Sequence, residues 1–140
     1  MNVEKIDHIC FAVKDLDAAR EKYESILGFK LDTLYTAESE KIRVARYYVG
    51  EVAIELMEAT GPDSEVAKFI EKQGEGFFLI SYRVPNVDDA LAELKGNDNK
   101  LIDDKPRKLM GNRYSFINYP NELNGILTEV LDGDFDPEKE

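Results

Sequence analysis

The chain contains one histidine, and its neighbours predict that it lies on a buried strand. Apolar residues alternate along the segment 6–13 with a period of two, which is typical of an extended strand. His8 would share a face with Cys10 and Ala12, whose small side chains leave space beside the imidazole. Because an unpaired buried polar group costs about 1 to 3 kcal/mol, His8 needs a partner, a metal ion or water. We interpret Cys10 as a small core residue with an inert thiol, since nothing in the sequence supplies electropositive surroundings for it.

Two carboxylates, Glu55 and Glu129, lie between apolar neighbours in segments that are typical of strands. A carboxylate is seldom buried in such surroundings without an ion pair or a metal ion. Together with His8, these side chains could supply three metal ligands from three strands. The alternative for each carboxylate is a salt bridge, with Arg83 or Arg46 as the candidate partner.

Hydrophobic periodicity predicts the elements that must position these residues. Helices are expected to begin near Asp17, at Glu65 and near Val87, and the first ends at Gly28. Strands are expected over 6–13, 29–35, 42–49, 52–57, 77–84, 101–102, 114–118 and 126–131. Loops are expected over 36–41, 103–112 and 119–125, and the residues from Asp132 onward are expected to be frayed.

An internal repeat relates the two halves of the chain. The segment His8–Val13 and the residues after it align without gaps with Leu79–Val84, at an offset of 71 residues. Further on, Glu55 aligns with Glu129, so each half is a strand, a helix and three strands. We therefore predict an α+β fold in which two repeated βαβββ modules form a cup-shaped mixed sheet with the helices outside. The three candidate ligands would converge in the cup.

Length and charge limit the domain organisation and the partners. The 140 residues are 43% hydrophobic and suffice for one domain with a hydrophobic core. We expect one domain over 1–140, divided into module one (about 4–60), a linker helix (about 61–76), module two (about 77–131) and an acidic tail (132–140). The net charge of −11 argues against nucleic acid as a partner, because phosphate binding needs clustered lysine and arginine.

The sequence also gives an expectation about the cellular compartment. No apolar run approaches the roughly 20 residues that span a bilayer, and the N-terminal residues are unlike a signal peptide. The single cysteine cannot form an internal disulfide. We expect a soluble protein of the reducing cytoplasm, without a membrane partner.

Several segments resemble, in the same order, those of the vicinal oxygen chelate superfamily, which is also called the glyoxalase/bleomycin resistance superfamily. They are Asp7–Ile9, Ala12–Leu16, Leu27–Lys30, Ile54–Leu56, Pro62–Lys72 with Gly74–Gly76, and Leu101–Asp103 with Lys105–Arg107. The similarity extends from about Ile6 to Leu131. The stretch from Pro62 to Gly76 is the most specific, and it resembles methylmalonyl-CoA epimerases.

The resemblance implies a metal site and a reaction. It implies a divalent ion held by one residue from each of four strands, and His8, Glu55 and Glu129 match the first, second and fourth ligands. Leu79 stands where the family has its third ligand, a histidine, and its side chain has no lone pair to donate. The remaining imidazole and two carboxylates suit Mn²⁺ or Mg²⁺ best among the candidate ions Mn, Mg, Co, Ni and Zn.

In the family's reaction a proton next to a thioester carbonyl is removed on one side and returned on the other. The candidate acid and base residues are Glu55, Glu129 and Glu38, because the base-bearing loop of the family falls at about Glu38 to Glu40. Within that loop Ser39 could instead hold the critical place, and both glutamates could be ordinary solvated residues. Arg83, on the cup face, suggests a changed ligand.

We therefore predict an enzyme of the isomerase (epimerase) or lyase type that acts on a small molecule, for which an acyl-CoA is one candidate. Four basic residues could hold CoA phosphates or be ordinary surface charges: Lys105, Arg107, Lys108 and Arg113. The resemblance is compatible with a homodimer. The alternative function is a metal-free binding protein of the same fold, whose metal site degenerated when Leu79 replaced the histidine.

Overall fold

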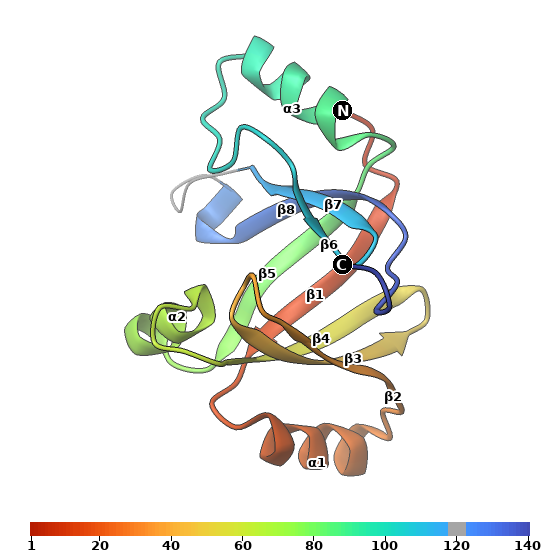
Figure 1. The fold of residues 1–140 in the computed structure, drawn as a ribbon, viewed down its shortest axis with the longest axis vertical. Coiled ribbons are helices and arrows are strands. Elements are labelled where there is room, and N and C mark those ends of the chain that lie inside the picture. The colour runs from red at the N-terminus through yellow and green to blue at the C-terminus, as the bar shows by residue number, and fades with distance from the viewer. Residues whose placement is uncertain (118–122) are drawn as a thin grey trace. The chain divides into compact units, whose positions relative to one another are not determined.

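The computed structural model describes residues 1–117 and 123–140, which fall into two compact units (Figure 1). The first unit is residues 8–78, and the second unit is residues 1–7 together with residues 79–140. Two strands extend across these bounds, and each is described with the unit that contains most of its residues. Among the described residues, no helix combines the length and the apolar character needed to cross a membrane.

The first unit follows the predicted order of strand, helix and three strands. Its elements are β1 (Lys5–Ala12), α1 (Leu16–Leu27), β2 (Leu31–Ala37), β3 (Ile42–Val49), β4 (Val52–Ala59) and α2 (Glu65–Gln73). β2 pairs antiparallel with β3 and β3 antiparallel with β4, whereas β4 pairs parallel with β1. The parallel pair matters for function, because its register sets Cys10 beside Glu55.

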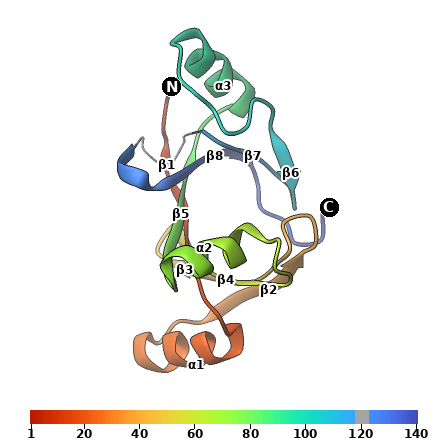
Figure 2. The ribbon, with the colours of Figure 1, turned by 90° about the vertical axis from the view of Figure 1, so that its left-hand side faces the viewer.

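The second unit repeats this arrangement, which confirms the predicted βαβββ duplication. Its elements are β5 (Gly76–Arg83), α3 (Val87–Gly96), β6 (Arg107–Leu109), β7 (Asn112–Phe116), the short 3₁₀ helix η1 (Leu123–Gly125) and β8 (Leu127–Gly133). β5 pairs parallel with β8, and β8 and β6 each pair antiparallel with β7. Figure 2 shows α3 next to β7 and β8, against which it packs through Val87, Ala90 and Leu91.

The helix boundaries follow from local capping. Asp15 accepts a hydrogen bond from the backbone N–H of Ala18 at 3.0 Å, and α1 ends where Gly28 adopts a left-handed conformation with φ of 69°. Ser64 caps α2 in the same way through the backbone N–H of Val66 at 3.2 Å. Polar side chains that can satisfy the first backbone N–H groups of a helix therefore set where both helices begin.

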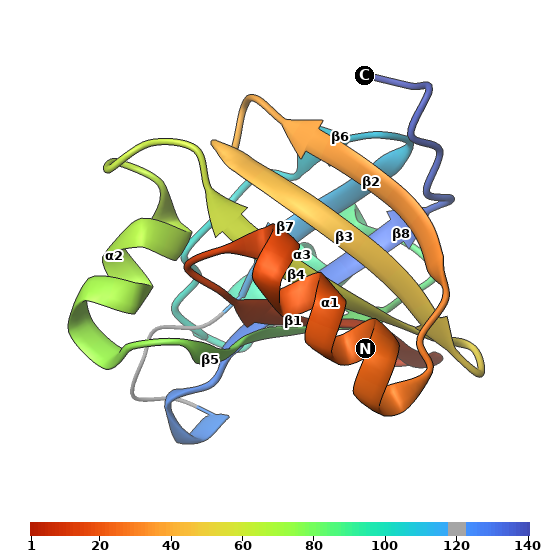
Figure 3. The same ribbon diagram turned by 90° about the horizontal axis from the view of Figure 1, so that it is seen from below.

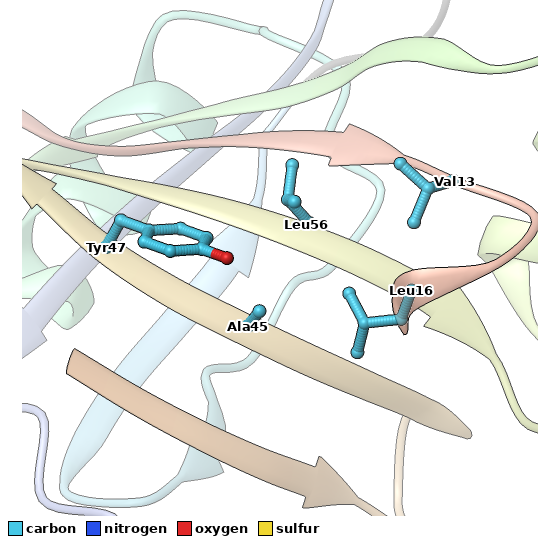
Figure 4. Packing of buried hydrophobic residues seen from close by; sticks show 5 residues of the cluster. All are labelled: Val13, Leu16, Ala45, Tyr47 and Leu56. Carbon is cyan, nitrogen blue, oxygen red and sulfur yellow. The ribbon is translucent and has the colours of Figure 1, made fainter. Parts of the chain in front are cut away.

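The core of the first unit lies between α1 and one face of β3 and β4 (Figures 3 and 4). It contains Val13, Leu16, Ala45, Tyr47 and Leu56, and Leu16 and Leu56 have no exposed surface. Burying side chains of this size contributes about 1.5 to 3 kcal/mol each. Neighbouring side chains on a strand point to opposite faces of the sheet. Because Leu56 packs against α1, the preceding side chain, Glu55, points to the other face.

The predicted strand at 101–102 is wrong. The apolar side chain of Leu101 packs against the core of the second unit, and residues 101–102 are not part of a strand. The following aspartate, Asp103, is bonded to Phe116, the last residue of β7. The backbone N–H of Asp103 donates to the Phe116 carbonyl at 3.0 Å, and its carboxylate accepts from the Phe116 N–H at 3.1 Å.

The predicted loop 103–112 contains a strand, β6, which forms a hairpin with β7. Met110 and Gly111 make the turn with positive φ angles of 49° and 86°, so that Leu109 and Asn112 become partners. The strand expected at 114–118 thus begins earlier, at Asn112. Residues 118–122, where part of that strand and of the loop 119–125 were expected, lie outside the described residues.

The frayed tail expected from Asp132 is also wrong at its start. β8 continues to Gly133, and Asp132 is buried because Arg113 donates to both of its carboxylate oxygens, at 2.6 and 3.0 Å. Beyond the strand, the backbone N–H of Asp136 donates to the Met110 carbonyl at 2.7 Å. Asp132 and Asp136 are therefore held by specific hydrogen bonds.

Candidate metal and active site

Parallel pairing of β1 and β4 brings His8, Cys10 and Glu55 together in the first unit. The Nε2 atom of His8 lies 3.8 Å from Oε1 of Glu55, and the Cys10 thiol donates to the same oxygen at 3.5 Å. The ligand atoms of the three side chains all lie within 4.8 Å of one another, and all three residues are buried. The sequence predicted that His8 and Glu55 would meet, but it did not predict a role for Cys10.

The second carboxylate oxygen of Glu55, Oε2, has two other donors. The Tyr35 hydroxyl donates to it at 2.8 Å, and Nη1 of Arg46, the residue opposite Glu55 on β3, donates at 2.9 Å. Arg46 also donates to the Tyr48 hydroxyl through Nε at 3.2 Å and Nη2 at 3.1 Å. The salt bridge between Glu55 and Arg46 that the sequence left open is therefore present. It leaves Oε1 as the oxygen that faces His8 and Cys10.

The charges of this cluster keep Glu55 ionised. Burial by itself raises the pKa of the Glu55 carboxyl, but the charges of His8 and Arg46 and the hydrogen bonds from Tyr35 and Arg46 outweigh it, so that the pKa lies below its ordinary value. Burial also raises the pKa of Tyr35 well above 10, and the neighbouring carboxylate raises it further. At neutral pH Glu55 is thus an anion and Tyr35 a neutral donor. An anion of low pKa suits metal binding better than proton abstraction, which is most effective when the pKa of the base is near the working pH.

Glu129 is the corresponding carboxylate of the second unit. It is buried on β8, and the hydroxyl of Ser81, its register partner on β5, donates to its Oε1 at 2.7 Å. Leu79 lies two residues before Ser81 and is also buried, with an apolar side chain where the family resemblance implies a ligand. Convergence of Glu129 with His8 and Glu55 stays a prediction.

The loop glutamates lie in a tight turn between β2 and β3. Glu38 is exposed, and its backbone carbonyl accepts from the N–H of Lys41, a residue with a positive φ of 55°. Glu40 is partly buried in the same turn. The exposure of Glu38 is compatible with a solvated turn and with a base that meets substrate from solvent, so its catalytic role stays a prediction.

The basic residues that could hold CoA phosphates divide into two kinds. Arg113 is bonded to Asp132, and Arg107 donates to Asp103 at 2.9 Å. Both arginines therefore have structural partners inside the protein. Lys105 and Lys108 are exposed at the start of the hairpin formed by β6 and β7.

Arg83 has acidic partners in its own unit. Its guanidinium donates to the Gly133 carbonyl at 2.7 Å and to Asp134 at 3.3 Å, and it lies 3.8 Å from Asp7. These contacts explain why a cation stands at this position without a change of ligand. The sequence-based suggestion that Arg83 signals a new substrate group thus has a simpler structural explanation.

Sequence reasoning missed the hydroxyl of Tyr35 and gave no preference between the two candidate arginines. A signal for Arg46 was available, because residues equally far from the Gly50–Glu51 turn pair across the hairpin, as Val49 with Val52 and Arg46 with Glu55. Tyr35 could not be found this way, because it is not a register partner of Glu55: it pairs with Val44 on β3, two residues from Arg46.

A comparison with protein families identifies the class of protein to which this fold belongs. The chain belongs to the Glyoxalase/Bleomycin resistance protein/Dioxygenase superfamily, whose family model matches residues 7–116. This match confirms the resemblance seen in the sequence.

Individual relatives give a narrower comparison. The chain is 35% identical over 131 residues to the uncharacterized protein YqjC of Bacillus subtilis, covering 93% of each chain. It is 24% identical over 130 residues to the mitochondrial methylmalonyl-CoA epimerase of Bos taurus, covering 92% of this chain and 74% of the relative. A solved methylmalonyl-CoA epimerase in complex with methylmalonyl-CoA and NH₄⁺ superimposes with a TM-score of 0.86 at 32% identity, covering 93% of this chain and 94% of the other. The predicted α+β fold is therefore the fold of these epimerases.

Proposed function

We propose that the protein is an epimerase of a CoA thioester, which moves a proton at the carbon next to the thioester carbonyl. The substrate class is an α-branched malonyl-CoA such as methylmalonyl-CoA, which the solved relative binds. The observation that carries the proposal is the buried pair of His8 and Glu55, with 3.8 Å between Nε2 and Oε1, in a chain with the fold of these epimerases.

The residues of the first unit fit a divalent metal ion. Two donors bound to one ion at about 2.0 to 2.2 Å are separated by roughly 3 to 4 Å, and the His8 and Glu55 donor atoms already meet this condition. The family resemblance implies Glu129 as a further ligand, but here we assign Glu129 to proton transfer instead. When bound, a divalent ion supplies a positive charge that stabilises the enolate oxygen of the thioester.

The proton itself needs a base on one face of the substrate carbon and an acid on the other. Glu55 is unsuited to be the base, because its pKa is held low and Oε2 is occupied by two donors. We assign these roles to Glu129 and Glu38. One carboxylate takes the proton, and the other gives a proton back on the opposite face, so that the configuration is inverted and no proton is lost overall.

Exchange of the substrate proton for deuterium tests this proposal. Methylmalonyl-CoA incubated with the protein and a divalent ion in D₂O should lose its α-proton NMR signal faster than without protein. Glu129→Gln and Glu38→Gln should slow the exchange by about 100-fold or more, in line with the usual contribution of an acid or base. Glu21→Gln, which changes an exposed carboxylate on α1, is the matched control and should exchange at the wild-type rate. Wild-type exchange no faster than the protein-free rate would refute the proposed activity.

A metal-free binding function is the second candidate, and the salt bridge supports it. Arg46 already neutralises Glu55, and within residues 1–117 and 123–140 no buried side-chain nitrogen or oxygen lacks a hydrogen-bond partner. Metal analysis of the purified protein separates the candidates. Stoichiometric metal that is lost in His8→Ala supports the enzyme, whereas a metal-free protein that binds methylmalonyl-CoA without proton exchange supports the binding function.

A further inference from the structure

Cys10 lies in the cluster of the first unit, yet neither proposed function uses it. It has no exposed surface, and its Sγ atom is 3.5 Å from Oε1 of Glu55, the oxygen that also faces Nε2 of His8. A cysteine that only fills a core is surrounded by apolar atoms. Here the sulfur instead shares the space between an imidazole and an ionised carboxylate.

We propose that Cys10 is a metal ligand, so that the first unit alone supplies nitrogen, sulfur and oxygen donors to one ion of the Zn²⁺ or Co²⁺ class. This inference rests on the proposed function for the presence of a divalent ion, and it adds the donor atom and the class of ion. It replaces the expectation of Mn²⁺ or Mg²⁺, because a thiolate favours softer ions over those that prefer oxygen alone.

Two of the three distances between the donor atoms are close to those around one tetrahedral ion, and all three lie within 4.8 Å. With metal–sulfur and metal–oxygen bonds of about 2.3 and 2.0 Å, the tetrahedral angle places the two ligand atoms about 3.5 Å apart. The observed distance between Sγ of Cys10 and Oε1 of Glu55 is 3.5 Å. The distance between His8 and Glu55 donors is 3.8 Å, against about 3.3 Å for ideal tetrahedral nitrogen and oxygen ligands, so these two donors need approach each other only by a few tenths of an ångström.

The charges favour a thiolate as well. Arg46 cancels the charge of Glu55, so a divalent ion bound by neutral His8 and Glu55 alone would leave two uncompensated positive charges in a buried place. Uncompensated buried charge is costly. A coordinating cysteine releases its proton to solvent, and the resulting anion removes one of these charges.

The internal repeat separates this cluster from its counterpart in the second unit. At the offset of 71 residues Leu79 takes the place of His8, and Ser81 takes the place of Cys10. Ser81 donates to Glu129 at 2.7 Å, as Cys10 donates to Glu55. These strand positions thus hold an imidazole, a thiol and a carboxylate in the first unit. In the second unit they hold an apolar side chain, a hydroxyl and a carboxylate. A strong set of donors exists only at the first of these two clusters.

Cobalt spectroscopy tests the proposal directly. Co²⁺ added to the full-length protein should give the near-ultraviolet charge-transfer band of a thiolate bound to cobalt. Cys10→Ser and Cys10→Ala should abolish the band and weaken binding by about 100-fold or more, because losing even an outer-shell partner of a ligand costs roughly 10- to 100-fold. Ser81→Ala is the matched control, since it removes the equivalent side chain of the second unit, and it should keep the band. Circular dichroism shows whether each variant is folded.

X-ray absorption of the wild-type protein loaded with Zn²⁺ gives a result that needs no variant. It should show one sulfur at about 2.3 Å from zinc. Cobalt or zinc bound without sulfur would overturn the role of Cys10, and so would a protein that binds neither ion. Because proton exchange is measured separately, exchange that persists in either case would keep the epimerase proposal while this inference fails.

Discussion

Removing the cation that holds Glu55 should destabilise the protein strongly. We predict that Arg46→Met lowers the free energy of unfolding by about 3 to 5 kcal/mol, the usual cost of breaking a buried pair from one side. The cost is expected to be that of a buried pair, because Arg46 and Glu55 are only 4% and 2% exposed and solvent cannot replace the guanidinium. The lost bond at 2.9 Å is to a charged group and is worth about 1.5 to 3 kcal/mol alone. Loss of the guanidinium charge beside a buried carboxylate accounts for the rest, and the carboxylate keeps the Tyr35 hydroxyl and the charge of His8 as its other partners.

Urea unfolding at neutral pH, followed by circular dichroism, measures this loss. The companion variants Glu55→Gln and Arg46→Met/Glu55→Gln complete a double-mutant cycle. The double variant should be more stable than the sum of the two single losses predicts, since it removes both members of the buried Arg46–Glu55 pair together. A loss below about 1 kcal/mol for Arg46→Met, or single losses that simply add, would refute the reasoning.

The same pair predicts a dependence on pH. The pKa of Glu55 is lower in the folded protein than its ordinary value of 4.5, so its contribution to stability is complete above that pH and is lost as the pH falls through the lower folded value. The difference in stability between wild type and Arg46→Met should therefore be largest at neutral pH and shrink in acid. A difference that does not change with pH would contradict the assignment.

Three further changes give measurable losses of stability. Tyr35→Phe removes the donor at 2.8 Å from Glu55 and should cost about 1.5 to 3 kcal/mol in urea unfolding, and a loss near zero would mean that water takes its place. Asp132→Asn weakens the paired bonds from Arg113 and should cost about 1 to 3 kcal/mol at neutral pH. Because the pKa of Asp132 lies below 3.8, through hydrogen bonds that outweigh the effect of burial, this loss should fade as the pH drops below that value, and a constant loss would contradict it. Ser64→Ala removes the cap of α2 and should cost about 1 kcal/mol in thermal or urea unfolding, whereas Ser64→Thr should retain most of it.

Local chemistry made much of the fold predictable. Asp15 and Ser64 are capping residues placed directly before periodic apolar segments, and the helices begin where those residues indicate. The offset between His8 and Leu79 exposed the duplication, and that duplication implied the order of elements in both units. Signals of this kind depend on a few adjacent residues, so they survive without knowledge of the tertiary structure.

Long-range packing explains what the sequence did not predict. Leu101 was placed on a strand because it is apolar, but its hydrophobic partners belong to the core against α3. β6 was taken for a loop because only three residues pair, and their pattern is mostly charged. In the candidate site, the proximity of His8 and Glu55 followed from the repeat. The hydroxyl of Tyr35 reaches Glu55 from β2, a strand that does not pair with β4, and no local pattern reveals such a contact across a third strand.

The duplicated architecture gives the molecule its own internal reference. Cys10 and Ser81 occupy matching places, each next to a carboxylate on the neighbouring parallel strand, yet one offers a thiol and the other a hydroxyl. A property that comes from strand geometry alone, such as the protection of their backbone amides from hydrogen exchange, should be shared by both copies. A property that comes from side-chain chemistry, such as a thiol against a hydroxyl, should differ between them. A measurement of both copies in one sample can therefore separate the effect of the fold from that of the side chain.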